Sequence, residues 1–172
     1  MIALSERLPP RHELFLVLAA CIFPIHFWIS IVLLYKFPSL ILKANLWQIM
    51  GVFAYTFAFT LIESLLIFGS LVMIAIIFPT KFFRARFVHR GTLIAISIAV
   101  SALIINFWVL AENKWIISII AISFLLLLIY LSQRPKESKL MNSFAERLTV
   151  ISIIFIFTDM LSVFYIILRQ FI

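Results

Sequence analysis

Charged residues are scarce in this 172-residue chain, and their scarcity excludes a water-soluble fold. Charged side chains make up 12% of the sequence and hydrophobic ones 65%, whereas soluble domains are about half apolar and about a quarter charged. Seven acids and fourteen bases are too few to cover so much apolar surface in water. A bilayer can accept that surface because lipid is itself an apolar solvent. We therefore expect an integral membrane protein.

Glycine and cysteine are also rare, and this limits both the architecture and the chemistry. Three glycines and six prolines leave little room for long loops, so we expect no sizeable soluble domain on either side of the membrane. The single cysteine, Cys21, can form no internal disulfide and has no partner at metal-ligand spacing. The sequence contains no HExxH, CxxC, phosphate-binding glycine loop or serine elbow. It thus predicts no metal and no cofactor, and it favours a protein that is not an enzyme.

The net charge of +7 does not indicate nucleic-acid binding, because the bases lie between apolar runs. Such bases set the orientation of membrane proteins and attract anionic lipid. The expected partners are the lipid bilayer and other membrane subunits or further copies of the chain, with no nucleic acid.

Apolar runs predict an all-α bundle of five transmembrane helices in a single domain, residues 1–172. The predicted spans are 14–35, 46–78, 92–111, 115–131 and 144–168. Lys36 and Pro38 are expected to end the first span, and Ser143 with Glu146 resembles a capping box that begins the last. As one helix the second run would measure roughly 50 Å, which exceeds a ~30 Å hydrocarbon core. We expect one long helix that tilts or projects, with Gly51 as the alternative point for a break.

The distribution of bases predicts which side each end occupies. The N-terminus and the loops 79–91 and 132–147 hold ten bases, and the opposite side holds four. The positive-inside rule then places the N-terminus in the cytoplasm and the C-terminus on the outer side of a multi-pass cell-membrane protein. Basic and aromatic residues alternate in the first of these loops, as is typical of the headgroup region. The predicted lipid-headgroup contacts are Lys81, Arg84, Arg86 and Arg90.

Three ionisable residues lie near the middle of predicted spans: His26, Glu63 and Asp159. At that depth an ionisable side chain costs roughly 2.5 kcal/mol or more, so residues of this kind face each other or water rather than lipid. Helical spacing at 100° per residue groups Thr60 with Glu63 and Ser162 with Asp159. We therefore predict a polar cluster of these five residues between the first, second and fifth helices.

The polar cluster has two interpretations. It is either a proton or cation site, as in pumps and transporters, or a set of hydrogen bonds that holds the bundle or a partner helix together. A histidine with two acids could also support acid–base catalysis, although three single residues on three helices indicate this weakly. The sequence favours a non-catalytic subunit or accessory protein of a larger membrane assembly. The alternative is a small proton- or cation-coupled transporter or channel.

Overall fold

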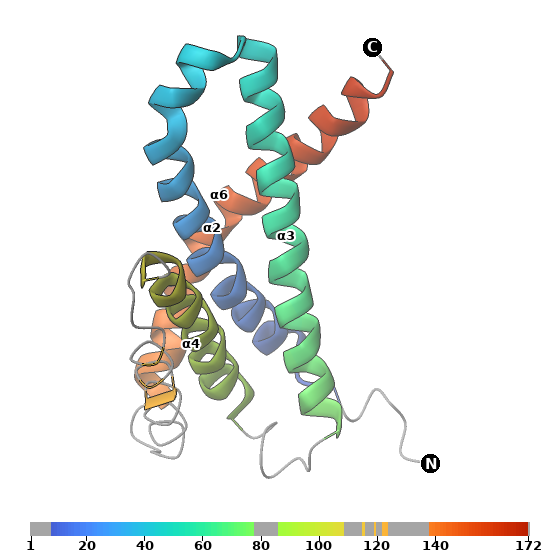
Figure 1. Ribbon diagram of the computed structural model, residues 1–172. Helices are drawn as coiled ribbons and strands as arrows, with labels where there is room; N and C mark the ends of the chain where they lie inside the picture. Colours follow the sequence, from blue (N-terminus) through green and yellow to red (C-terminus); the bar gives the residue numbers. More distant parts are fainter. Residues whose placement is uncertain are drawn as a thin grey trace.

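The protein is all-helical throughout the part of the chain that the structure describes (Figure 1). This computed structural model describes residues 8–77, 86–108, 115, 119, 122–123 and 138–171, with the backbone alone at 102–108 and 138–141. Its helices are α2 (Arg11–Lys43), α3 (Leu46–Ile77), α4 (Phe87–Trp108) and α6 (Ser138–Arg169).

Three of these helices are long and apolar enough to cross a membrane. They are α2, α3 and the part of α6 from Asn142 to Arg169. The apolar part of α4, Phe87–Ser101, is shorter. Length and composition therefore identify a helical protein of the membrane type.

The first helix continues past the point where it was predicted to end. Lys36 and Pro38 both lie inside α2, which ends at Lys43. Pro38 lacks an N–H and so removes the helical hydrogen bond to the carbonyl of Leu34. The neighbouring Ser39 hydroxyl donates to the carbonyl of Lys36 at 2.8 Å. Because backbone groups near lipid have few other partners, continuing the helix costs less than ending it there.

A turn of two residues, Ala44 and Asn45, joins α2 to α3. The Gln48 backbone N–H donates to Oδ1 of Asn45 at 2.9 Å, and the Asn45 N–H donates to Oε1 of Gln48 at 3.0 Å. This reciprocal capping box fixes the start of α3. The helix then continues to Ile77 without a break at Gly51.

The later helices begin before the apolar runs that were predicted as spans. α4 begins at Phe87, five residues before the predicted span 92–111. α6 begins at Ser138, so Ser143 and Glu146 lie within a helix and do not cap one. A short polar segment between two apolar runs can thus be helical when the residues that follow it already form a helix. The predicted span 115–131 lies outside the described residues apart from four positions.

α2 occupies the centre of the bundle and contacts each of the other three helices. One apolar cluster joins it to α3 and α4, and a second joins it to α4 and α6. α4 crosses α2 closely at Gly91, where a Cβ atom would meet the Cγ atoms of Val17 at 2.9 and 3.0 Å. α3 and α6 also pack against each other, so α2, α3 and α6 form a three-helix core with α4 on its side.

α2 and α6 run in the same general direction where they cross (Figure 1). The Ser152 hydroxyl of α6 donates to the Ala19 carbonyl of α2 at 2.9 Å. Seven residues further along both helices, Asp159 contacts His26. Two contacts with the same sequence separation of 133 residues require helices of the same direction. Accordingly, the N-terminal end of α2 and the C-terminal end of α6 lie at opposite ends of the bundle (Figure 1).

Candidate functional site

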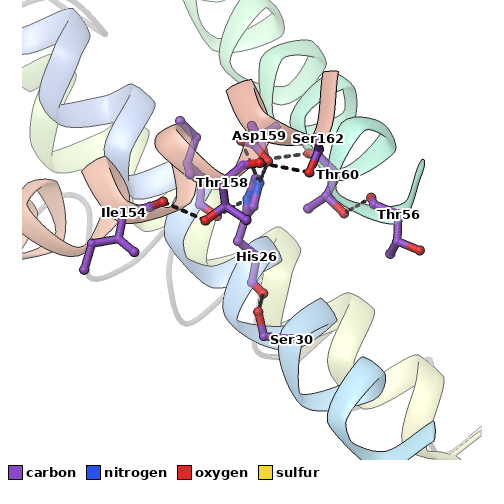
Figure 2. A network of polar contacts seen from close by, with 10 residues as sticks. His26, Ser30, Thr56, Thr60, Ile154, Thr158, Asp159 and Ser162 are labelled. Carbon is purple, nitrogen blue, oxygen red and sulfur yellow. Dashed lines mark hydrogen bonds and ion pairs between the residues drawn. The ribbon is translucent and has the colours of Figure 1, made fainter. Parts of the chain in front are cut away.

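The central polar contact of the bundle joins His26 of α2 to Asp159 of α6 (Figure 2). Nε2 of His26 lies 3.0 Å from both carboxyl oxygens of Asp159. Both side chains are buried, with 0% and 1% of their surface exposed. We call these two residues the inner pair.

The second nitrogen of His26, Nδ1, carries a hydrogen. Nδ1 lies 2.9 Å from the backbone carbonyl oxygen of Ile22. A carbonyl oxygen only accepts, so Nδ1 carries a hydrogen and donates it. Hence either an imidazolium Nε2–H donates to an ionised Asp159, or a protonated Asp159 donates to a neutral Nε2. In both forms one proton lies between the two residues and the inner pair has no net charge, which lowers the cost of placing it inside a membrane.

Aromatic rings surround His26. The ring of Phe155 on α6 has its centroid 5.2 Å from that of His26, and the ring of Phe57 on α3 has its centroid 6.1 Å away. The ring of Phe23, one turn before His26, has its centroid 6.3 Å from that of Phe155. Such an apolar wall excludes water and strengthens the hydrogen bonds inside it. The pair therefore joins α2 to α6 beside an apolar wall.

The hydroxyl groups predicted to belong to the cluster are buried but form hydrogen bonds within their own helices. Thr60 donates to the Thr56 carbonyl and Ser162 to the Thr158 carbonyl, each at 2.8 Å. Ser30, one turn after His26, donates in the same way to the His26 carbonyl at 2.8 Å (Figure 2). Hydroxyls that bond to the carbonyl one turn earlier are satisfied without a partner helix. Thr60 and Ser162 thus contribute small buried groups next to the core rather than ligands of the pair.

Glu63 lies outside the inner pair. Its side chain is exposed on α3, and no hydrogen bond or ion pair joins it to any residue that the structure describes. The inward face of α3 carries Thr60 and Ser64, which are 2% and 0% exposed. Glu63 is 100° away from Ser64 around the helix, which is enough to turn it from the core to the surface. The structure therefore brings together two of the three predicted midplane residues and leaves the third outside the contact.

An apolar pocket of about 380 Å³ lies between α3 and α6. It is lined by Leu61, Ile156, Asp159, Met160, Val163, Phe164 and Ile167. Asp159 is the single polar residue in this lining. A path for protons or hydrated cations needs successive polar groups or water, and this lining supplies one carboxyl group.

A second polar group lies at the start of α4. Arg86 and Arg90 are half-buried there, and His89 and Thr92 are buried. The sequence placed Arg86 and Arg90 with Lys81 and Arg84 at the lipid headgroups, and the latter two lie outside the described residues. Burial of His89 could not be predicted, because a histidine among bases before an apolar run is equally typical of a surface loop.

Contacts between the N-terminal part of α3 and the C-terminal part of α6 were not predicted either. The Tyr165 hydroxyl donates to the Trp47 carbonyl at 3.0 Å, and the two rings lie 5.2 Å apart. The Arg169 guanidinium lies 6.0 Å from the centroid of the Tyr55 ring. A Cβ atom at Gly51 would clash with this guanidinium. Aromatic and basic residues at one end of the bundle are typical of a membrane interface.

The site offers no metal centre within the described residues, where no three His, Cys, Asp or Glu side chains come together. No protein-family model, curated protein or solved structure matches the chain. The fold and the site therefore define the class of the protein, a helical membrane protein with a closed histidine–aspartate contact, and further conclusions depend on the chemistry of its residues.

Proposed function

We propose that the protein is a non-catalytic subunit or accessory protein of a larger assembly in the cell membrane. One observation supports this proposal above all. Glu63, at the middle of α3, is exposed on the outside of the bundle, while the other two midplane residues satisfy each other. A carboxyl group facing lipid at that depth costs roughly 2.5 kcal/mol or more. A neighbouring membrane helix that supplies a hydrogen-bond partner would remove much of that cost.

The proposed assembly subunit has five spanning helices, with a cytoplasmic N-terminus and a C-terminus on the outer side. The parallel directions of α2 and α6 support an odd number of crossings between them. α3 and α4 account for two, so the apolar run 115–131 would supply the third. The ten bases on one side and four on the other support the proposed orientation.

Cysteine labelling tests this topology. In a Cys21→Ala background, Ser138→Cys should react with an impermeant maleimide only after the membrane is opened. A cysteine at the C-terminal position Phe171 should react in intact cells and serves as the matched control. Labelling of Ser138→Cys in intact cells would show that the orientation is wrong.

Purification in a mild detergent, followed by native mass measurement, tests the role as a subunit. The expected result is a stoichiometric complex of this chain with at least one other chain, of the same or of a different kind. A monodisperse monomer from membranes in which the protein is correctly folded would contradict the proposal.

The alternative function is a small proton- or cation-coupled transporter. Its support is the single proton that the inner pair holds, together with the pocket that reaches Asp159. Reconstitution into vesicles with an internal pH dye tests it. Proton flux that is lost in Asp159→Asn and kept in Glu63→Gln would favour transport, whereas vesicles without flux would favour the subunit.

A further inference from the structure

The outward face of α3 carries a regular stripe of residues at alternating spacings of four and three. We call this set the outer stripe, and its members are Val52, Thr56, Phe59, Glu63, Leu66, Ser70, Met73 and Ile77. The spacing is that of the a and d positions of a heptad repeat, which two helices use when they pack side by side with a left-handed crossing. The same geometry is common between transmembrane helices.

Within the described residues, the bundle leaves the outer stripe uncovered apart from Thr56, which is half-buried. Phe59, Leu66, Met73 and Ile77 are 65%, 66%, 58% and 70% exposed. Glu63 and Ser70 are exposed as well. The core-facing residues of α3 belong to another face of the helix, which carries Phe57, Thr60, Ser64, Leu71 and Ala75. α3 thus has two long faces, one used by the bundle and one available to a neighbour.

Polar and apolar residues alternate in layers along the outer stripe. The hydroxyl and carboxyl side chains of Thr56, Glu63 and Ser70 occupy three successive a positions. Apolar side chains, Phe59, Leu66 and Met73, occupy the d positions between and after them. In a parallel pair of helices each a residue meets the a residue of its partner, so a helix with this pattern is complementary to a second copy of itself.

From this pattern we infer that the outer stripe is a homodimer interface in which the Glu63 carboxyl groups of two copies hydrogen-bond to each other. The inference rests on the proposed role as a subunit and names the partner as a second copy of the chain.

Depth and direction favour a second copy over an unrelated helix. All copies of a membrane protein insert in the same direction, so a two-fold axis along the membrane normal places Glu63 of each copy at the same depth. The stripe from Val52 to Ile77 measures roughly 38 Å along the helix at about 1.5 Å per residue, which covers a ~30 Å hydrocarbon core.

Two carboxyl groups can satisfy each other without any charged partner. A protonated carboxyl group donates one hydrogen bond and accepts others. Two such groups therefore exchange a pair of hydrogen bonds, and a group that has lost its proton still accepts from its protonated neighbour. Lipid chains offer neither donor nor acceptor at this depth, so the dimer supplies a bond that the monomer lacks.

Cross-linking of the full-length protein in its own membrane tests this interface. In the Cys21→Ala background, Leu66→Cys places a thiol on the outer stripe, and Leu65→Cys places one on an exposed position one residue away. A disulfide needs Cα atoms within about 7 Å. The expected result is an oxidised dimer with Leu66→Cys and not with Leu65→Cys. Equal cross-linking at both positions, or none at Leu66→Cys, would overturn the interface.

Dimer affinity in detergent or lipid, measured by energy transfer between labelled copies, tests the role of the carboxyl group. Glu63→Leu should weaken the dimer about tenfold, the effect expected of a hydrogen bond between membrane helices. Glu63→Gln should stay close to the native affinity, because an amide also donates and accepts. Unchanged affinity in Glu63→Leu would contradict the carboxyl pairing.

The same experiments separate this inference from the proposed function. If native mass shows a complex with a different protein and Leu66→Cys gives no dimer, the subunit role stands and the homodimer inference fails. If the protein is a monomer in both measurements, both fail.

Discussion

The inner pair and Glu63 are ionisable residues of long apolar helices, and their surroundings are opposite. His26 and Asp159 are buried and satisfy each other from helices whose register is set by a second contact two turns away. Glu63 is one helical step from the core face of α3 and finds no such partner within the described residues. An ionisable residue in a membrane span is therefore neither structural nor functional by its depth alone; the face on which it lies decides which neighbours it can bind.

Removal of one member of the inner pair is expected to have the largest effect. Asp159→Ala leaves a ring nitrogen of His26 buried without its partner, and the bundle should lose about 3 kcal/mol of unfolding free energy. Reversible unfolding in mixed detergent micelles measures this loss.

Two variants serve as controls for that experiment. Asp159→Asn keeps a group that can donate to or accept from Nε2 and should lose less. The double variant His26→Leu, Asp159→Leu removes both polar groups and should recover much of the loss. If the double variant were as unstable as the sum of the single variants, the pair would not be coupled.

Loss of the hydroxyl contact between α6 and α2 should lower the unfolding free energy by a smaller amount. Ser152→Ala removes the hydrogen bond to the Ala19 carbonyl, and interhelical bonds of this kind contribute about 1 kcal/mol in membranes. Ser162→Ala is the matched comparison, since its hydroxyl bonds within its own helix, and it should change stability less. Equal losses in both variants would indicate that buried volume, and not the interhelical bond, stabilises the contact.

Substitution of Glu63 should have the smallest effect on the single chain. Glu63→Leu replaces an exposed carboxyl group with an apolar one, so the unfolding free energy of the dilute monomer should change by less than ~0.5 kcal/mol or rise slightly. The same variant should weaken association, as described above. A loss comparable to that of Asp159→Ala would mean that Glu63 contributes to the core after all.

The sequence predicted the helices more reliably than their ends. Uninterrupted apolar runs indicate membrane helices because the cost of exposing backbone groups to lipid applies to every residue of the run. Ends depend on individual hydrogen bonds, and these were predicted wrongly at Pro38 and at Ser143. The capping box of Asn45 and Gln48, which begins α3, is present in the sequence as an asparagine followed three residues later by a glutamine.

The candidate site was predictable in part for the same reason. The depths of His26 and Asp159 follow from counting along the spans, and helical periodicity places Thr60 and Ser162 on inward faces. Periodicity also grouped Glu63 with Thr60, because three residues along a helix are only about 60° apart. A difference of 60° is too small to tell from sequence which of the two side chains faces the core.

By itself, the sequence determined that this is a helical protein of the membrane type, and it predicted that three ionisable groups lie deep in its spans. It could do so because transfer of apolar and charged groups into lipid depends on composition and on position along the helix. Only the tertiary structure decided that α6 runs in the same direction as α2, that Asp159 meets His26, and that Glu63 faces outward. Those outcomes depend on the rotation and register of packed helices, which are set by contacts such as Ser152 with Ala19 and Gly91 with Val17 between residues far apart in the chain.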